Sequence, residues 1–161
     1  MRSAKRFVIQ ALASCFFLTY PLVHLAKKRK WRWTGAGFIG SLAGLGCARW
    51  LPTQPIRCAV VLIGAFFISV AVSDAAEEIL QNKDDQRIVI DEWVGYLASI
   101  AFLPKTSVIL ITGFVFFRIS DTLKLAGVNK LARLPGGWGI VMDDVAGGIL
   151  VNAILHLLPL S

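Results

Sequence analysis

Residues 88–103 read IVIDEWVGYLASIAFL, an apolar segment that carries two adjacent carboxylates, Asp91 and Glu92, close to its start. A helix needs about 20 apolar residues to cross a bilayer. This segment approaches that length only if it begins near Gln86 and includes both carboxylates in its first turns. Because an ionisable side chain at membrane depth costs roughly 2.5 to 3.5 kcal/mol on insertion scales, the pair predicts a functional site at a membrane interface.

Five further apolar segments predict the rest of the fold, at residues 7–26, 35–51, 56–73, 107–119 and 140–160. Hydrophobic residues make up 56% of the 161 residues, which is too apolar for an ordinary soluble domain. The predicted fold is all-α, a polytopic membrane helical bundle that contains short and interfacial helices. We expect one domain over residues 35–161, preceded by an apolar segment and a basic cluster over residues 1–34.

Charge distinguishes the two ends of the predicted bundle. The chain has 17 Lys and Arg against 10 Asp and Glu, a net charge of +7, and its basic clusters at 2–6 and 27–32 adjoin apolar segments. This pattern favours an anionic membrane surface over nucleic acid. If the helices alternate in direction, one end collects most charged side chains. These are Asp74, Glu77, Asp84, Asp85, Asp91, Glu92, Arg118, Asp121, Lys124, Asp143, Asp144, Lys83, Arg87, Lys130, Arg133 and the basic cluster at 27–32. Its basic residues predict that this end is cytoplasmic.

The first apolar segment, 7–26, allows two interpretations. It resembles a signal peptide but lacks a small-residue cleavage site after Pro21, so we expect it to be retained. A full crossing would place the basic N-terminus outside, and a position in the membrane interface is the alternative. The three cysteines, Cys15, Cys47 and Cys58, have no CxxC spacing and predict neither a disulfide nor a zinc site.

Two acidic pairs are the candidate metal ligands. Asp91 and Glu92 form one pair, for which an ion pair with Arg87 or Arg118, or a favourable position at a helix N-terminus, is the alternative interpretation. Asp143 and Asp144 form the other pair, after the glycine-rich turn at 135–139. N-capping explains at most one of these aspartates, since a cap normally precedes the apolar residues of its helix.

A third group lies on one predicted helix face, where Arg118, Asp121 and Lys124 recur at intervals of three. The spacing fits a self-contained row of ion pairs, and it equally fits a carboxylate ligand flanked by two cations that bind a phosphate ester. Gly40 and Ser41 are further candidates for phosphate binding at a helix start. Close helix packing through Gly37, Gly40 and Gly44 is the alternative for that segment.

Several carboxylates without accompanying His or Cys ligands predict a hard cation, and Mg²⁺ commonly shares its ligands between carboxylates, water and phosphate. The expected metal ligands are Asp91, Glu92, Asp121, Asp143 and Asp144. No cysteine-based phosphatase loop or P-loop lysine occurs, so we expect attack by a metal-activated water. A non-enzymatic cation-binding or transport protein is the alternative, but it should carry polar groups throughout the bilayer depth.

Six short motifs occur in a specific order: GFIGSL at 37–42, AE at 76–77, KD at 83–84, IVIDEWVG at 88–95, FRISDTLK at 117–124 and GGWGIVMDDVAG at 136–147. Together they resemble the phosphatidylglycerophosphatase A family of bacterial membrane enzymes. The resemblance covers roughly residues 35–155.

This resemblance implies Mg²⁺ dependence and hydrolysis of the phospholipid phosphatidylglycerophosphate to phosphatidylglycerol at the cytoplasmic face of the inner membrane. From the residues themselves we expect catalytic roles for Asp91, Glu92, Asp144 and Arg118, with phosphate bound by Arg118, Lys124, Gly40 and Ser41. Two departures occur: Phe38 replaces a usual threonine, and Leu125-Ala126-Gly127 replaces a Pro-x-Pro sequence. Both departures predict a change in substrate preference or activity relative to typical members.

Overall fold

The computed structural model describes residues 2–30, 34–83, 85–123, 131 and 133–159. These residues form α-helices joined by turns, with no strand among them, which confirms the all-α prediction. The helices are α1 (Arg2–Ala13), α2 (Thr19–Lys28), α3 (Ala36–Cys47), α4 (Pro55–Leu80), α5 (Ile90–Ser99), α6 (Ser107–Leu123) and α7 (Gly137–Leu157), with a single 3-10 turn, η1 (Ala48–Trp50), after α3.

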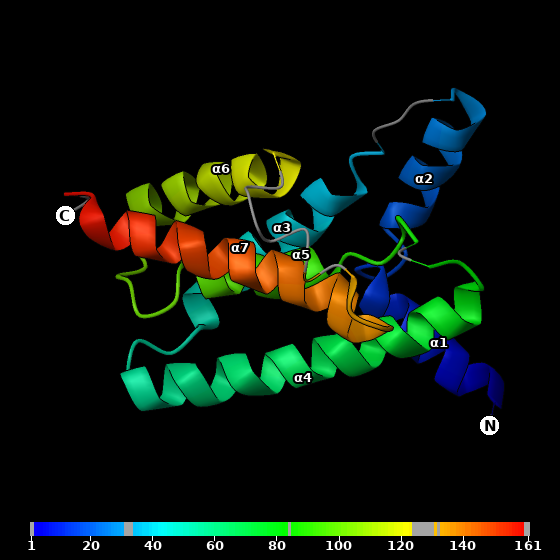
Figure 1. The fold of residues 1–161 in the computed structure, drawn as a ribbon, viewed down its shortest axis with the longest axis horizontal. Helices are drawn as coiled ribbons and strands as arrows, with labels where there is room; N and C mark the ends of the chain where they lie inside the picture. Colours follow the sequence, from blue (N-terminus) through cyan, green and yellow to red (C-terminus); the bar gives the residue numbers. More distant parts are fainter. Residues whose placement is uncertain (1, 31–33, 84, 124–130, 132, 160–161) are drawn as a thin grey trace.

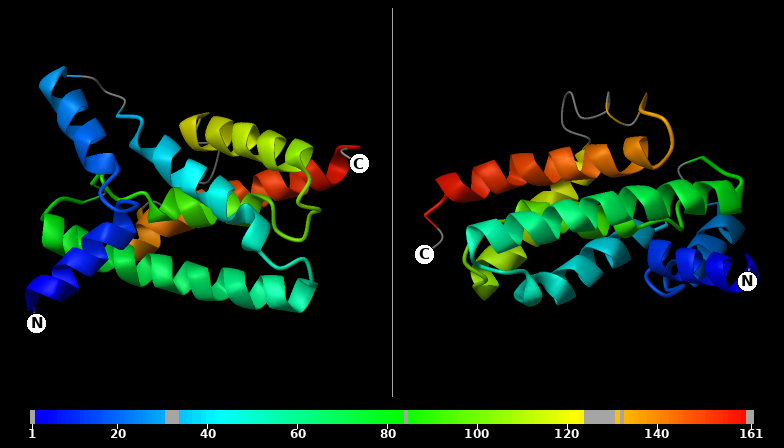
Figure 2. Two further views of the ribbon diagram at one scale, coloured as in Figure 1. Left: turned by 180° about the vertical axis from the view of Figure 1, so that it is seen from behind. Right: turned by 90° about the horizontal axis from the view of Figure 1, so that it is seen from below.

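The short helix α5 lies at the centre of the bundle, surrounded by α3, α4, α6 and α7 (Figure 1). Its most extensive contacts are with α7, and Figure 2 shows the long helices α4 and α7 running along the bundle. The side chains of Val94, Tyr96 and Leu97 are buried in this packing. The helix that begins with Asp91 and Glu92 is therefore held on all sides by protein.

Two glycines allow α5 and α7 to pack closely. A Cβ atom at Gly148 of α7 would collide with the backbone carbonyl of Gly95 in α5, and a Cβ at Gly95 would lie 2.9 Å from the carbonyl oxygen of Asp144. Small residues at a helix crossing let the two backbones approach, as is common between membrane helices. This contact sets the distance between the two acidic pairs.

We predict that Gly148→Ala lowers the free energy of unfolding by about 1 to 3 kcal/mol, because the added methyl group forces α5 and α7 apart. Gly64→Ala in α4 is the matched control, since a Cβ there meets no atom within 4 Å. The control should be neutral or stabilising by up to about 1 kcal/mol, the helix-propensity gain of alanine over glycine. Thermal unfolding of both variants in detergent micelles checks this, and equal effects at the two glycines would contradict it.

Among the described helices, α4 and α7 are long and apolar enough to cross a membrane. Only 28% of the most apolar window of α4 and 33% of that of α7 is buried within the protein, which is low for core helices of a soluble domain. Large apolar side chains face outward on three helices, namely Ile56, Val60, Ile63 and Phe67 on α4, Val108, Ile111, Val115 and Ile119 on α6, and Ile149 and Leu157 on α7. Apolar surface of this extent suggests contact with lipid.

The prediction for residues 88–103 was wrong in length. The helix begins at Ile90 instead of near Gln86 and ends at Ser99, so it is only about 15 Å long and cannot cross a bilayer. Asn152 of α7 donates hydrogen bonds to the carbonyl oxygens of Ser99 (3.1 Å) and Ala101 (2.8 Å), which satisfies the backbone where the helix stops. Protein side chains thus replace the helical hydrogen bonds that a spanning segment would need.

Residues 7–26 form two helices instead of one. Cys15, Phe16 and Phe17 adopt positive φ angles of 47°, 57° and 65°, which end α1 and redirect the chain into α2. At 12 and 10 residues, both helices are too short to cross a bilayer. The structure excludes a single crossing helix here, and the interfacial position remains a prediction.

The connection between α4 and α5 is fixed by Asp85, whose side chain is 2% exposed. Its carboxylate accepts hydrogen bonds from Arg87 Nε (2.7 Å) and Nη2 (2.8 Å), the Arg87 amide (3.0 Å) and Asn82 Nδ2 (2.8 Å). Thr19 Oγ1 in turn donates to the Arg87 carbonyl oxygen at 3.0 Å, and the Val89 amide donates to the Ala13 carbonyl oxygen at 2.8 Å. The start of α5 is therefore tied to α1 and α2.

This arrangement predicts a pH-dependent contribution to stability. Burial alone would raise the pKa of Asp85, but the hydrogen bonds from Arg87 and Asn82 outweigh it and hold that pKa well below its usual range. The ionised Asp85 carboxylate contributes its full amount to the free energy of unfolding above the unfolded-state pKa of about 3.9. This contribution is lost as the pH falls from that value toward the lower pKa of Asp85 in the folded state. We expect Asp85→Asn to cost about 2 kcal/mol at pH 7 and progressively less below about pH 4. Thermal unfolding measured from pH 3 to 7 checks this, and a cost that is the same at both ends would contradict it.

A carboxylate-lined candidate active site

Three carboxylates from two helices converge at one point. Asp91 and Glu92 lie in the first turn of α5, and Asp144 lies in the second turn of α7. One oxygen from each of the three lies within 4.8 Å of one from each of the others. The sequence separation between the two helices makes this a product of the fold, and it agrees with the predicted convergence of the acidic pairs.

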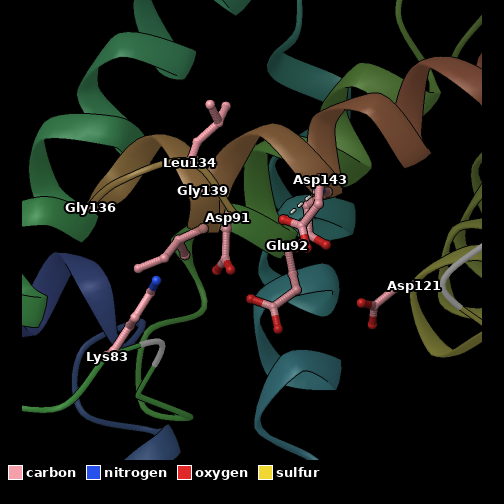
Figure 3. A pocket seen from close by; sticks show the side chains of 10 residues that line it. Lys83, Asp91, Glu92, Asp121, Leu134, Gly136, Gly139 and Asp143 are labelled. Atoms are coloured by element: carbon pink, nitrogen blue, oxygen red, sulfur yellow. Dashed lines mark hydrogen bonds between the residues drawn. The ribbon is translucent and has the colours of Figure 1, made fainter. Parts of the chain in front are cut away.

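These groups line a cavity of about 410 Å³ that also includes Asp121 of α6 and Asp143 of α7. Figure 3 shows the carboxylates of Asp91 and Glu92 side by side, with Asp121 directed toward Glu92 from the neighbouring helix. Lys83 enters from the α4–α5 connection, and its amine approaches the acidic cluster from the opposite wall (Figure 3). All five carboxylates expected as metal ligands thus share one cavity.

The chemistry of the donors suits a hard divalent cation. Asp91 and Asp144 are each 8% exposed, and Glu92 Oε2 is buried without a hydrogen-bond partner among the described residues. Two like charges 4.8 Å apart repel by on the order of 3 kcal/mol at an effective dielectric constant near 20. Carboxylate oxygens are the ligands that Mg²⁺ takes most readily from proteins. The residues present therefore fit the metal that the sequence predicts.

Arg118 of α6 joins the acidic cluster to α3. Its Nη1 atom lies 2.9 Å from Asp121 Oδ2 and donates a hydrogen bond to Ser41 Oγ at 3.2 Å. Ser41 is fully buried and its hydroxyl donates to the Gly37 carbonyl oxygen at 3.0 Å. The guanidinium is therefore held in place beside the cavity by one contact from α6 and one from α3.

The glycines of α3 lie directly against this site. A Cβ at Gly37 would collide with Glu92 Oε1, and a Cβ at Gly40 would collide with the Val89 carbonyl oxygen. This placement of Gly40 fits the packing alternative, in which glycine lets α3 approach α5. Ser41 accepts a hydrogen bond from the guanidinium of Arg118, so it acts on the site by positioning Arg118.

The start of α7 is stabilised from a distance. Asp74 of α4 accepts a hydrogen bond from the Gly137 amide at 3.2 Å, and a Cβ at Gly136, where φ is +57°, would collide with the same carboxylate. Asp74 thus serves as the capping group of α7, so N-capping does not explain Asp143 or Asp144. Asp143 instead accepts a hydrogen bond from the Asp144 amide at 3.1 Å and lines the cavity.

The two arginines considered as ion-pair partners of Asp91 and Glu92 each form an ion pair with another carboxylate. Arg87 pairs with Asp85 at 2.7 Å, and Arg118 pairs with Asp121. Lys124, the third residue of the row formed with Arg118 and Asp121, lies outside the described residues, as does the departure at 125–127.

The sequence placed Lys83 at this end of the bundle but did not single it out as a site residue. Its position in the polar connection before Asp91 is the signal that marks it.

The described residues define an all-helical protein with two helices long and apolar enough to cross a membrane, and its acidic cavity and adjacent arginine suit phosphate chemistry. A family model described as phosphatidylglycerophosphatase A matches residues 12–159. The chain belongs to this family, whose members are phosphatases that act on a phosphomonoester. No solved structure matches the chain.

Two relatives show the range of substrates attached to similar sequences. Phosphatidylglycerophosphatase A of Escherichia coli (strain K12) is 31% identical over 127 residues, which cover 76% of this chain and 73% of the relative. A protein of Bacteroides thetaiotaomicron, provisionally named a phosphatidylinositol-3-phosphatase, is 37% identical over 71 residues, which cover 42% of this chain and 45% of the relative. The matched part of this chain thus spans less than half of the Bacteroides protein.

Proposed function

We propose that this protein hydrolyses phosphatidylglycerophosphate to phosphatidylglycerol and inorganic phosphate, with Mg²⁺ bound in the carboxylate cavity. The observation that carries the proposal is the convergence of Asp91, Glu92 and Asp144 within 4.8 Å, next to Arg118. The Escherichia coli relative is named for the same activity.

The metal would be held by Asp91, Glu92 and Asp144, with Asp121 and Asp143 at the edges of the same cavity. When bound there, Mg²⁺ supplies positive charge that polarises the phosphoryl group and lowers the pKa of water. Five carboxylates in one cavity make that charge favourable, since they would otherwise repel one another.

Arg118 binds and orients the phosphate in this proposal. A guanidinium can make two parallel hydrogen bonds to phosphate oxygens, and these are among the strongest that a protein forms. The hydrogen bond to Ser41 limits rotation of the Arg118 side chain, so binding the substrate costs little additional side-chain entropy. Lys83 adds a second cation on the opposite wall.

Proton transfer falls to a carboxylate of the cavity. Hydrolysis requires a base for the proton of the attacking water and an acid for the leaving glycerol oxygen, and one carboxylate can serve as both in turn. Asp121 pairs with Arg118, so a carboxylate of the cavity lies beside the group that binds the phosphate in this proposal. Neither step needs a covalent phospho-enzyme.

We place the site at the cytoplasmic face of a bacterial inner membrane. Lys83 and Arg87 lie in the α4–α5 connection, at the site's end of the bundle, and α2 ends with Lys27 and Lys28, followed by Arg29. Positive charge accumulates on the cytoplasmic side of membrane proteins. An anionic lipid would also be attracted to this end.

The proposal is tested by phosphate release from three substrates in detergent micelles containing Mg²⁺: phosphatidylglycerophosphate, phosphatidylinositol 3-phosphate and phosphatidic acid. We expect the highest kcat/KM for phosphatidylglycerophosphate. Preference for phosphatidylinositol 3-phosphate would overturn the substrate assignment in favour of the activity named for the Bacteroides relative. Absence of phosphate release from every lipid by a folded, Mg²⁺-binding protein would favour the cation-binding or transport alternative.

A further inference from the structure

We propose that an acyl chain of the lipid substrate binds in an apolar groove between α3 and α6 that begins at Arg118. The proposal rests on the phosphatase function proposed above and adds the route by which the lipid reaches the site. Figure 1 and Figure 2 show α3 and α6 side by side, and the two helices are in contact.

The groove has a volume of about 470 Å³ and is mostly apolar; among its described lining residues, Arg118 is the one with a charge and Thr122 carries a hydroxyl. Its lining residues are Phe38 from α3 and Phe114, Val115, Arg118, Ile119, Thr122 and Leu123 from α6. The rings of Phe38 and Phe114 meet edge to face at 5.3 Å and join the two helices across the groove. Phe38 is one of the two family departures, and its side chain forms part of this wall.

Arg118 connects the groove to the carboxylate cavity. It lines the groove, while its Nη1 atom contacts Asp121, which lines the cavity. A long arginine side chain commonly places its methylene groups against apolar surface and its guanidinium against polar groups. A phospholipid has the same division between an anionic head and an apolar chain, so its charge pattern complements that of the groove and the cavity together.

A second apolar groove argues by contrast for this assignment. It lies between α4 and α7, has a volume of about 620 Å³, and has no charged residue among its described lining residues. Its one polar side chain, Asn152, already donates to two backbone carbonyl oxygens. Although this groove is larger, it offers nothing to hold an anionic head group. The α3–α6 groove combines apolar walls with a cation that belongs to the site.

The kinetic test compares long-chain and short-chain substrates. Val115→Trp fills the groove, and Ile111→Trp is the matched control, because Ile111 is exposed on the same helix but does not line the groove. We expect Val115→Trp to lower kcat/KM for dioleoyl phosphatidylglycerophosphate by about tenfold more than for the dihexanoyl lipid, the factor expected when about two methylene groups lose their burial. Ile111→Trp should leave the ratio unchanged. An unchanged ratio in Val115→Trp would overturn the proposal.

A binding test separates this proposal from the phosphatase function. Phosphatidylglycerophosphate and phosphatidylcholine, each with a photoactivatable diazirine in one acyl chain, are crosslinked to the wild-type protein in micelles, and the labelled peptides are identified by mass spectrometry. We expect the phosphomonoester lipid to label residues of the groove in preference to the outward face of α4, and phosphatidylcholine to show no such preference. Equal labelling of both faces by both lipids would refute the groove, whether or not the protein releases phosphate. Selective labelling without phosphate release would retain the groove and reject the phosphatase.

Discussion

Asp144→Asn is expected to lower kcat for phosphate release from phosphatidylglycerophosphate by at least about a hundredfold. Asparagine keeps the shape of the side chain but removes a negative charge and an anionic ligand from the point where Asp91, Glu92 and Asp144 meet. Loss of a residue that only supports a metal ligand typically costs 10–100-fold, so loss of a ligand itself should cost at least as much. Steady-state phosphate release at saturating Mg²⁺ measures the effect.

Stability distinguishes this loss from misfolding. Without Mg²⁺, Asp144→Asn should unfold at the same temperature as the wild type or higher, because the substitution relieves repulsion among buried carboxylates. Added Mg²⁺ should raise the unfolding temperature of the wild type more than that of the variant. Glu78→Gln is the control, since Glu78 is exposed on α4 and does not line the cavity. Wild-type kcat in Asp144→Asn would remove this residue from the site.

Arg118→Ala is expected to lower kcat/KM by about a hundredfold, which is the scale of removing one group that stabilises developing negative charge. Arg118→Lys should recover only part of this loss, because an ammonium group cannot contact Ser41 and also make two parallel hydrogen bonds to phosphate. Arg57→Ala is the control, because Arg57 is an exposed arginine at the opposite end of α4. Phosphate release over a range of lipid concentrations in micelles separates kcat from KM.

Comparing the lysine and alanine variants distinguishes two roles of Arg118, orienting the phosphate and pairing with Asp121. If Arg118 merely pairs with Asp121 to stabilise α6, Arg118→Lys should restore activity fully, since lysine preserves that charge interaction. Full recovery by lysine would therefore reject a direct role for Arg118 in orienting phosphate. Partial recovery, with thermal stability equal to that of the wild type, would support that role.

The long helices and the meeting of the acids were predictable from local signals. The apolar segments that became α4, α6 and α7 each follow a turn that contains Pro or Gly, and alternating helix direction was enough to bring Asp91, Glu92 and Asp144 to one end. Helix α4 also continues beyond the apolar segment 56–73 to Leu80 and so includes Asp74. These features depend on hydrophobic periodicity, composition and the alternating direction of successive helices, all of which can be read from a single sequence.

Other features depend on contacts that no local pattern contains. The early end of α5 relies on Asn152, more than fifty residues away, and the capping of α7 relies on Asp74 of another helix. The break between α1 and α2 places Cys15, Phe16 and Phe17 at positive φ, a conformation that residues other than Gly, Asn and Asp rarely adopt. The apolar composition of residues 7–26 carries no signal for this break, so it suggested one continuous helix.

The most direct test of the carboxylate site is isothermal titration of Mg²⁺ into protein that has been stripped of metal with EDTA, using the wild type, Asp91→Asn and Asp144→Asn. Saturable binding to the wild type, lost or strongly weakened in both variants, is the predicted result, because the two aspartates come from different helices and share one ion only if α5 and α7 meet as described. Binding in both variants that matches the wild type, or no saturable binding to the wild type, would contradict the account.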